Sequence, residues 1–237
     1  MLHINGLTVT FGGLVAVSDV TFDMREGEVL GLVGPNGAGK TTLFNAICGL
    51  ARPGSGTVEL MGKNLLSMPI HHRARAGIGR AFQVPQPMHE LTVRENLTVA
   101  QRFGAGKVDK AKIEELLDVL KLGHKADMDA ATSLALTEQK ALEVGKALAT
   151  EPKLLMLDEV LAGLETTGKR AFLDTLEEVR KRYRLSVMIV EHDIETITRM
   201  CPRVLVLNFG RLIADGSPDQ VFNDPEVIRS YTGGEPA

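Results

Sequence analysis

The sequence has no tryptophan and only two tyrosines, so it offers few aromatic platforms on which the bases of a single-stranded nucleic acid could stack. It also has no basic block, and its formal net charge is -3 at pH 7. Proteins that bind nucleic acid usually carry a basic patch or stripe. We therefore expect no nucleic acid among the partners of this chain.

Cysteine is nearly absent as well. Cys48 and Cys201 are far apart in the sequence and stand in apolar stretches, which predicts two buried thiols rather than a disulfide and favours a reducing compartment. The longest apolar runs have the length of strands, and no basic region followed by a long apolar one opens the chain. We expect a protein that is neither secreted nor membrane-spanning by itself.

What is present is the alternation of strands and helices that is typical of an α/β protein. Apolar residues make up 44% of the 237 residues, enough for a substantial core. Short alternating segments predict an antiparallel β subdomain near the start, and helical spacing predicts a helical insert over about 84–149. The segments on both sides, about 1–83 and 150–237, predict a mainly parallel sheet covered by helices. No linker separates independent domains, so we expect a single domain over 1–237.

The strongest motif is a glycine loop at residues 34–41. It reads Gly34-Pro35-Asn36-Gly37-Ala38-Gly39-Lys40-Thr41 and matches G-x-x-x-x-G-K-[ST] at every fixed position. A buried-strand run precedes it at 28–33 and helical spacing follows it at 42–48, which is the order that a phosphate-binding loop requires. Backbone N–H groups and the helix N-terminus would then surround a phosphate. Lys40 would neutralise the β- and γ-phosphates, and Thr41 would offer its hydroxyl to Mg²⁺.

Two further groups follow predicted strands. Asp158-Glu159 come after four apolar residues, where a strand would deliver carboxylates to the sheet edge that also holds the phosphate loop. Asp158 would hold the magnesium ion, and Glu159 would polarise the attacking water. His192 follows the strand at 187–190 and could hydrogen-bond the γ-phosphate; the alternative is a histidine that opens a helix with Asp193 as the cap.

The order and spacing of these motifs resemble the ATPase subunits of ABC transporters over essentially the whole chain. The resemblance implies a P-loop NTPase core, ATP and Mg²⁺ as cofactors, and hydrolysis of ATP between two subunits that pair head to tail. It adds three assignments: Phe11 as the aromatic that stacks on adenine, Gln83 as a ligand of the metal and γ-phosphate site that faces the membrane partner, and Ala162-Gly163-Leu164-Glu165 as the loop after the catalytic glutamate. The expected nucleotide-binding set is Phe11, Gly34, Pro35, Asn36, Gly37, Ala38, Gly39, Lys40, Thr41 and Thr42; the expected metal set is Thr41, Gln83 and Asp158; and the expected catalytic set is Glu159, His192 and Gln83.

A finer resemblance is to the ATPases of branched-chain amino-acid uptake systems. It is carried by residues 75–83, by 91–97 and by the tail at 223–231. It implies integral membrane permease subunits, a second ATPase subunit in a heterodimer or a homodimer, a solute-binding protein, and a peripheral position at the cytoplasmic face of the inner membrane. Two alternatives stay open: a lipopolysaccharide-export ATPase, and a soluble regulatory module that binds nucleotide.

The chain departs from the family pattern at the segment that aligns with the LSGGQ signature. Leu134-Ala135-Leu136-Thr137-Glu138 has lost the serine and both glycines, and Glu138 would bring a negative charge toward an anion. Val160 also replaces the proline that usually follows the catalytic glutamate, and Glu165 replaces an aspartate. These changes leave the phosphate loop of this chain intact. They affect the signature segment, which in the family completes the nucleotide site of the partner subunit.

Overall fold

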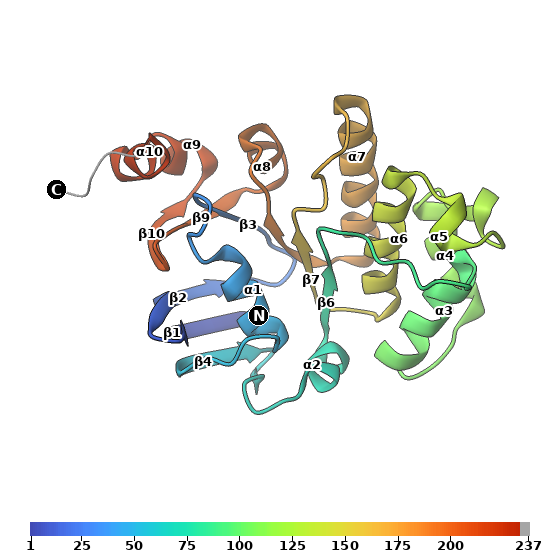
Figure 1. Ribbon diagram of the computed structural model, residues 1–237, viewed down its shortest axis with the longest axis horizontal. Coiled ribbons are helices and arrows are strands. Elements are labelled where there is room, and N and C mark those ends of the chain that lie inside the picture. Colours follow the sequence, from blue (N-terminus) through green and yellow to red (C-terminus); the bar gives the residue numbers. More distant parts are fainter. Residues whose placement is uncertain (233–237) are drawn as a thin grey trace. The chain divides into compact units, whose positions relative to one another are not determined.

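The computed structural model describes residues 1–232, and the chain divides into two compact units (Figure 1). The first unit combines the two ends of the chain, Met1–Arg73 and Met188–Ala237, and the second is the middle segment Ala74–Val187. Helix α2 (Ile70–Ala76) and strand β8 (Ser186–Val190) each run across a boundary between the units.

An antiparallel sheet opens the first unit. Its strand order is β2-β1-β4-β5, where the strands are β1 (Leu2–Phe11), β2 (Leu14–Met24), β4 (Ser55–Leu60) and β5 (Lys63–Asn64). Alternate residues of β1, such as Leu2, Ile4, Leu7 and Val9, are buried, as expected for a sheet with one covered face. Helix α1 (Lys40–Cys48) packs on β1 and β2 (Figure 1).

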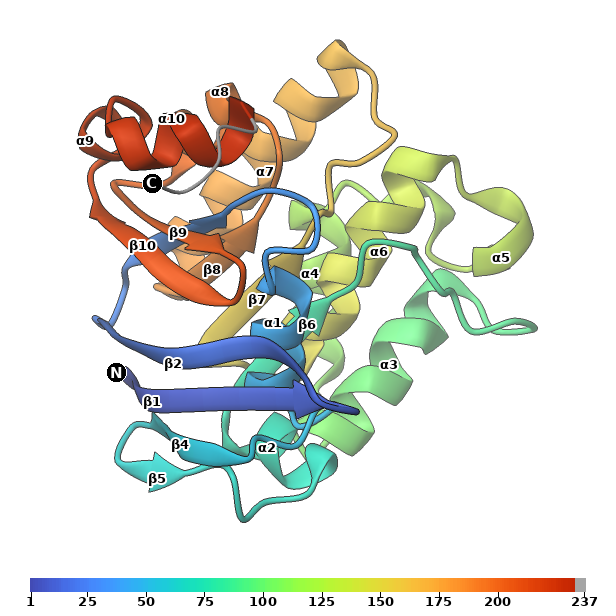
Figure 2. The ribbon, with the colours of Figure 1, turned by 60° about the vertical axis from the view of Figure 1, so that its left-hand side comes forward.

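The rest of the first unit is built around β3 (Val29–Val33), a strand that is buried along its whole length. Strand β9 (Arg203–Asn208) pairs with it in parallel, in a register that sets Val33 opposite Val206, and β10 (Arg211–Gly216) continues β9 as an antiparallel hairpin. Helices α9 (Pro218–Phe222) and α10 (Pro225–Thr232) lie against this hairpin (Figure 2), and α8 (Ile194–Met200) contacts β3. In the sequence, the apolar runs at 204–207 and 211–214 on either side of Asn208-Phe209-Gly210 predict this hairpin, and helical spacing predicts a helix at 194–200; both predictions are confirmed.

The second unit combines a pair of parallel strands with a group of helices. The strands are β6 (Ile78–Ala81) and β7 (Leu154–Asp158), and the helices are α3 (Val93–Gly104), α4 (Lys110–Val119), α5 (Ala130–Ser133), α6 (Leu136–Ala149) and α7 (Thr166–Tyr183), with a 3-10 turn at Gly123–Lys125. Helix α6 is the centre of this unit because it packs on α3, α4, α7 and both strands. The predicted helices between 84 and 149 are confirmed, whereas α5 and β5 were not predicted.

The two units do not coincide with the predicted subdomains. The predicted boundaries lie near residues 84 and 149, whereas the contacts divide the chain after Arg73 and Val187, because β6, β7 and α7 pack with the helices of the middle segment. The division into an α/β core and a helical subdomain therefore stays a prediction. Among the described residues, no helix has both the length and the apolar character that crossing a membrane requires.

Candidate nucleotide site

The glycine loop lies between β3 and α1, as the sequence predicts. Gly34 follows the last residue of β3, Gly39 is the cap residue of α1, and the helix begins at Lys40. Asn36, Gly37 and Thr41 are exposed, while Ala38 and Lys40 are buried. The first turn of α1 therefore stands next to an exposed loop, and the N–H groups of a helix's first turn can bind a phosphate.

Two of the glycines are required by close backbone approaches inside the first unit. A Cβ atom on Gly34 would stand 2.1 Å from the carbonyl oxygen of Leu207, and one on Gly39 would stand 2.4 Å from the carbonyl oxygen of Ala16. Both glycines also have positive φ angles, +148° and +105°. The hairpin adds a further tie, because the Gly210 N–H donates to the Ala38 carbonyl at 2.9 Å. The loop is thus shaped by β2 and by the β9–β10 hairpin as well as by its own sequence.

Lys40 closes the loop on itself. Lys40 is only 5% exposed. Its ammonium group donates to the carbonyls of Gly34 at 2.7 Å and Pro35 at 2.9 Å. At the other end of α1, the guanidinium of Arg73 donates to the carbonyls of Ala46 and Ile47 at 2.7 and 3.0 Å. A cation at the C-terminus of a helix interacts favourably with the helix dipole. Arg73 therefore satisfies two carbonyls at the C-terminal end of the helix that carries Lys40.

Two further predicted site residues, Phe11 and His192, lie in the first unit, as does Tyr231. Phe11 ends β1 and is 53% exposed, so its ring is accessible. His192 is exposed, and Asp193 caps α8 by accepting from the Glu195 N–H, as the alternative interpretation of this segment predicts. The Gly34 N–H donates to the hydroxyl oxygen of Tyr231 in α10; burial raises the pKa of this tyrosine, and that hydrogen bond opposes the rise.

Asp158 forms a buried ion pair in the second unit. It is the last residue of β7, and its Oδ2 atom accepts from Arg80 Nη2 on the neighbouring strand β6 at 2.5 Å. The two side chains are only 9% and 7% exposed. The Arg80 guanidinium also stacks over the Phe82 ring, with its carbon 4.7 Å from the ring centroid. The carboxylate that is predicted to serve the metal thus has a fixed cationic neighbour.

Gln83 and Glu159 meet directly in the same unit. The Gln83 side-chain amide donates to Glu159 Oε2 at 2.6 Å. Glu159 has a positive φ angle of 49°, which is uncommon for a residue with a side chain and sets the direction in which its carboxylate leaves the backbone. The structure therefore brings together two of the three predicted catalytic residues.

The signature segment forms the start of α6. Ala135 is the cap residue and provides no side-chain acceptor, so Glu138 turns back and accepts from the Ala135 N–H at 2.8 Å. The same carboxylate accepts from Lys125 Nζ at 2.6 Å. Partial burial raises the pKa of Glu138, but the hydrogen bonds from Lys125 and the Ala135 N–H outweigh it, so the pKa lies below its ordinary value. Lys125 therefore offsets the negative charge of Glu138 within this chain, and the effect of Glu138 on an anion held by a partner stays a prediction.

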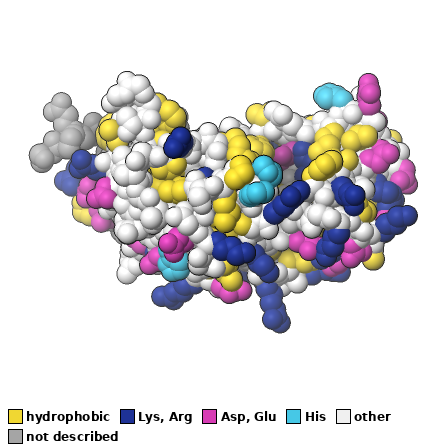
Figure 3. Space-filling model, turned by 90° about the horizontal axis from the view of Figure 1, so that it is seen from below, with side chains coloured by type: hydrophobic (Ala, Val, Ile, Leu, Met, Phe, Trp, Pro, Cys, Tyr) yellow, Lys and Arg dark blue, Asp and Glu magenta, His cyan; other side chains and the backbone are white. Residues whose placement is uncertain are grey.

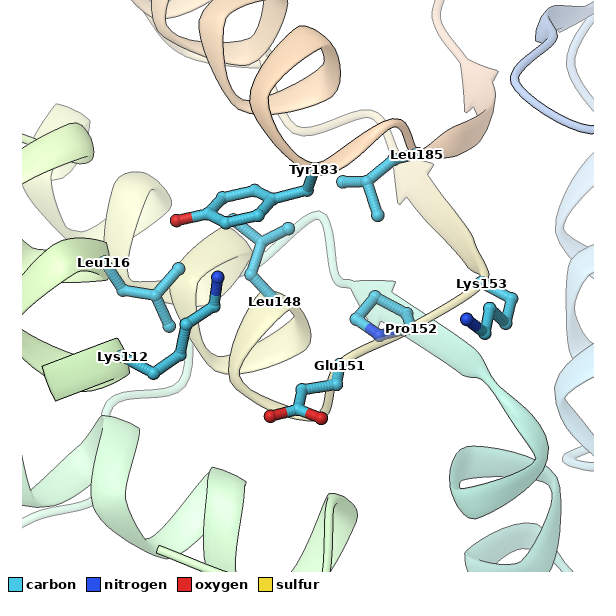
Figure 4. Close-up of a pocket in the computed structure, with 8 residues that line it drawn as sticks. All are labelled: Lys112, Leu116, Leu148, Glu151, Pro152, Lys153, Tyr183 and Leu185. Carbon is cyan, nitrogen blue, oxygen red and sulfur yellow. The ribbon is translucent and has the colours of Figure 1, made fainter. Parts of the chain in front are cut away.

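A pocket of about 300 Å³ in the second unit lies apart from these motifs. Figure 4 shows Tyr183, Leu116 and Lys112 on one side of it and Pro152 and Lys153 on the other, with the Lys112 ammonium 3.7 Å from the centre of the Tyr183 ring. No residue of the predicted site lines it. On the face drawn in Figure 3, basic and acidic side chains are interspersed.

The donor atoms of the predicted metal set fit Mg²⁺. Thr41, Gln83 and Asp158 provide only oxygen ligands, and Mg²⁺ keeps most of its waters, so it needs few groups from the protein. Among residues 1–232, no cluster of three or more His, Cys, Asp or Glu side chains forms a candidate metal site. A site built like those for zinc, with several imidazole or thiolate ligands, is thus not found in this part of the chain.

Sequence reasoning missed Arg80 and Lys140. Arg80 stands in the short apolar run Ile78–Ala81, where a charged side chain inside a strand has to find a buried partner. Lys140 lies on the inner face of α6 and is only 2% exposed. The helical spacing of the apolar residues around it could have placed it on that face.

Comparisons with known proteins agree on one family. Residues 17–162 match the ABC transporter family model, and residues 211–237 match that of the branched-chain amino acid ATP-binding cassette transporter. The chain is 36% identical to the high-affinity branched-chain amino acid transport ATP-binding protein LivG of Salmonella typhimurium and 35% identical to BraF of Pseudomonas aeruginosa, in each case over 98% of both chains. It is 33% identical to the lipopolysaccharide export system ATP-binding protein LptB of Haemophilus influenzae, over 98% of this chain and 97% of the relative.

Solved structures agree with the sequence relatives. The ADP conformation of MJ1267, an ATP-binding cassette of an ABC transporter, matches with a TM-score of 0.87 and 29% identity over 99% of both chains. CbiO1 from Clostridium perfringens, part of the transporter complex cbiONQ, matches with a TM-score of 0.83 and 30% identity over 98% of this chain and 94% of that one. The predicted α/β fold with a P-loop NTPase core is therefore confirmed.

Proposed function

The chain belongs to the family of ABC transporter ATPases, and from that premise we propose that it is the ATPase subunit of an importer for branched-chain or related amino acids. Membership of the family makes the chain an ATP-binding and ATP-hydrolysing protein. The observation that carries the choice of solute is the match of the C-terminal segment 211–237 to the branched-chain amino acid family, together with full-length similarity to LivG and BraF.

Each predicted site residue has a proposed role that agrees with its local geometry. Lys40 neutralises the β- and γ-phosphates, after exchanging its two carbonyl partners for phosphate oxygens. Glu159 positions and polarises the attacking water, because its carboxylate leaves the backbone in a fixed direction. His192 contacts the γ-phosphate, and Phe11 stacks on adenine with its accessible ring.

Thr41, Asp158 and Gln83 would hold Mg²⁺, which when bound offsets negative charge on the β- and γ-phosphates. Arg80 holds the Asp158 carboxylate in a fixed position through the buried ion pair before nucleotide binds. The glycines of the loop and the backbone N–H groups of residues 34 and 36–42 fix the position of the phosphates. These assignments give each residue a measurable consequence when it is replaced.

We further propose that this chain works with integral membrane permease subunits, a solute-binding protein and a second ATPase chain, at the cytoplasmic face of the inner membrane. In the family, the signature of one subunit closes over ATP held by the other. Ala135 lacks the serine hydroxyl that would serve there, so the site completed by this chain is expected to be slow. Loss of one such donor costs roughly 3 kcal/mol of transition-state stabilisation, on the order of a hundredfold in rate.

The test uses the transporter complex that this chain forms with its membrane subunits, placed in proteoliposomes. We expect ATP-dependent uptake of leucine, isoleucine or valine. Lys40→Ala should lose nucleotide affinity, and Glu159→Gln should keep affinity and lose turnover. Lys63→Ala, which removes an exposed lysine of the same unit, is the matched control and should behave as the wild type. Turnover by Glu159→Gln at the wild-type rate would show that another group positions the water.

One alternative keeps specific support. The similarity to LptB over 98% of the chain favours a lipopolysaccharide-export ATPase as the second candidate. The same vesicles distinguish the two functions, because the importer accumulates amino acid and the exporter releases lipopolysaccharide to an acceptor.

To test the unequal sites, the glutamate-to-glutamine change is placed in this chain or in the partner: the change at Glu159 should abolish most ATPase activity and the change in the partner much less. Equal losses would refute the asymmetry.

A further inference from the structure

Helix α6 presents two buried charged side chains to the segment that follows β6. Lys140 is 2% exposed and Glu143 is 5% exposed, although both stand in the middle of a helix in the second unit. A buried ammonium group is costly unless it is bound to acceptors. Lys140 Nζ donates to the backbone carbonyl of Gln83 at 3.1 Å. The lysine therefore fixes the main chain of a residue that is itself predicted to be catalytic.

The next contact in this chain of residues reaches the catalytic glutamate. Gln83 uses its backbone carbonyl for Lys140 and its side-chain amide for Glu159, where the nitrogen lies 2.6 Å from Oε2. The two contacts belong to one residue, so a shift of its main chain moves the amide as well. Three residues from three separate elements, α6, the segment after β6 and the end of β7, are thus connected in series.

A second tie holds the same segment three residues later. Glu143 Oε2 accepts from the Gln86 N–H at 3.3 Å, and Lys146 Nζ donates to the Gln86 carbonyl at 2.7 Å. Lys146 and Glu143 also pair with each other at 2.7 Å. Lys146 therefore resembles Lys140 in type, in helix and in contacting a backbone carbonyl, but its carbonyl belongs to Gln86 rather than to the residue that touches Glu159. This pair of lysines provides an internal comparison.

We propose that Lys140 is a positioning residue for ATP hydrolysis, which acts through Gln83 to orient the carboxylate of Glu159. The proposal rests on the assignment of Glu159 as the group that positions water. Because α6 begins at the signature segment, the same lysine joins this chain's signature helix to this chain's own catalytic carboxylate. A movement of α6 along its axis would be transmitted to Glu159 through one backbone carbonyl and one amide.

The first experiment measures turnover in the purified complex for Lys140→Met, Lys140→Arg and Lys146→Met. For Lys140→Met we expect kcat to fall about tenfold with KM within about twofold of the wild type, less than the ~100-fold or larger loss that removal of a general base produces. Lys140→Arg keeps a cationic donor and should restore most of kcat. Lys146→Met should leave kcat within about twofold. A loss of kcat for Lys146→Met as large as that for Lys140→Met would overturn the proposal, because it would indicate general loosening of the segment.

The second experiment does not depend on hydrolysis. The chain has no tryptophan, so Val84→Trp places a single fluorophore next to Gln83 at a position that is 64% exposed. In this background, Lys140→Met should shift the emission and should speed amide hydrogen exchange at residues 83–84, while Lys146→Met should act mainly at Gln86. Unchanged emission and exchange in Lys140→Met would overturn the proposal. If instead these signals change but Glu159→Gln retains turnover, the proposed function of Glu159 fails and the link between Lys140 and Gln83 stands.

Should Lys140→Met not fold, Lys140→Gln keeps a donor on a shorter side chain. It should retain the fold, as judged by thermal unfolding, and give a smaller loss of kcat in the same direction. Wild-type kcat in a folded Lys140→Gln protein whose exchange at residues 83–84 has risen would also overturn the proposal.

Discussion

Removal of Arg80 should destabilise the second unit far more than removal of any surface cation. The Arg80–Asp158 pair has an N–O distance of 2.5 Å and side chains that are less than a tenth exposed, so Arg80→Met leaves a buried carboxylate without its cation. Breaking a buried pair in this way costs about 3–5 kcal/mol. With a urea m-value of about 2 kcal/mol/M, the midpoint of unfolding should fall by roughly 2 M.

The assay is urea unfolding of the full chain, with amide hydrogen exchange in β6 and β7 to identify the transition that contains the pair. Lys181→Met is the control, since Lys181 pairs with Glu177 on the exposed face of α7 and such helical pairs contribute only about 0.3–0.5 kcal/mol. The double variant Arg80→Met with Asp158→Asn should recover part of the loss, because no buried charge remains, and the coupling energy should reach about 2–3 kcal/mol. A loss below about 1 kcal/mol for Arg80→Met, or strictly additive losses, would refute the reasoning.

Three further predictions concern the glycine loop, the tyrosines and the thiols. Gly34→Ala should weaken ATP binding at least about tenfold in a fluorescence titration, because its Cβ would stand 2.1 Å from a carbonyl oxygen; wild-type affinity would mean that the loop can relax. Burial raises the pKa of both Tyr183 and Tyr231 above the ordinary value of 10, so an ultraviolet titration of folded protein should show ionisation at higher pH than in urea. Since the folded state binds these protons more tightly, stability should fall as the pH rises past about 10. Burial raises the pKa of Cys201 to about 12 and Cys48 is also buried, so a thiol reagent should label neither until the chain unfolds, and rapid native labelling would contradict the burial.

The sequence predicts local structure well where one short segment holds all the necessary information. The start of α8 combines an acidic cap at Asp193 with helical spacing, and the predicted range Ile194–Met200 matches the helix. The glycine loop is equally well defined, because its residue types allow only a narrow set of backbone conformations. The hairpin at 203–216 follows from two apolar runs joined by a short turn that ends in Gly210.

The connections between distant segments could not be predicted in the same way. Arg80 and Asp158 are 78 positions apart, and only the parallel pairing of β6 with β7 brings them together. The proposed role of Lys140 depends on the burial of its side chain. The spacing of apolar and polar residues along the sequence does not show how deeply one lysine is buried. The Glu138 side chain folds back to accept from the Ala135 N–H. Ala135 has no side-chain acceptor, so of these two residues only Glu138 can satisfy a backbone N–H at the start of the helix.

The parallel pairing of β3 with β9 has a consequence for biosynthesis. The carbonyl oxygen of Leu207 and the N–H of Gly210 help to shape the glycine loop, yet they are made long after Gly34 and Ala38 leave the ribosome. At about 5–20 residues per second, the delay between Val33 and its neighbour Val206 is roughly ten to thirty seconds. During this interval the nascent chain contains every residue of the phosphate-binding motif but lacks Leu207 and Gly210, whose backbone groups contact the motif in the folded protein. Retention on an ATP resin should therefore separate chains that have synthesised β9 and β10 from those that stop before them, so that nucleotide binding measures completion of the fold.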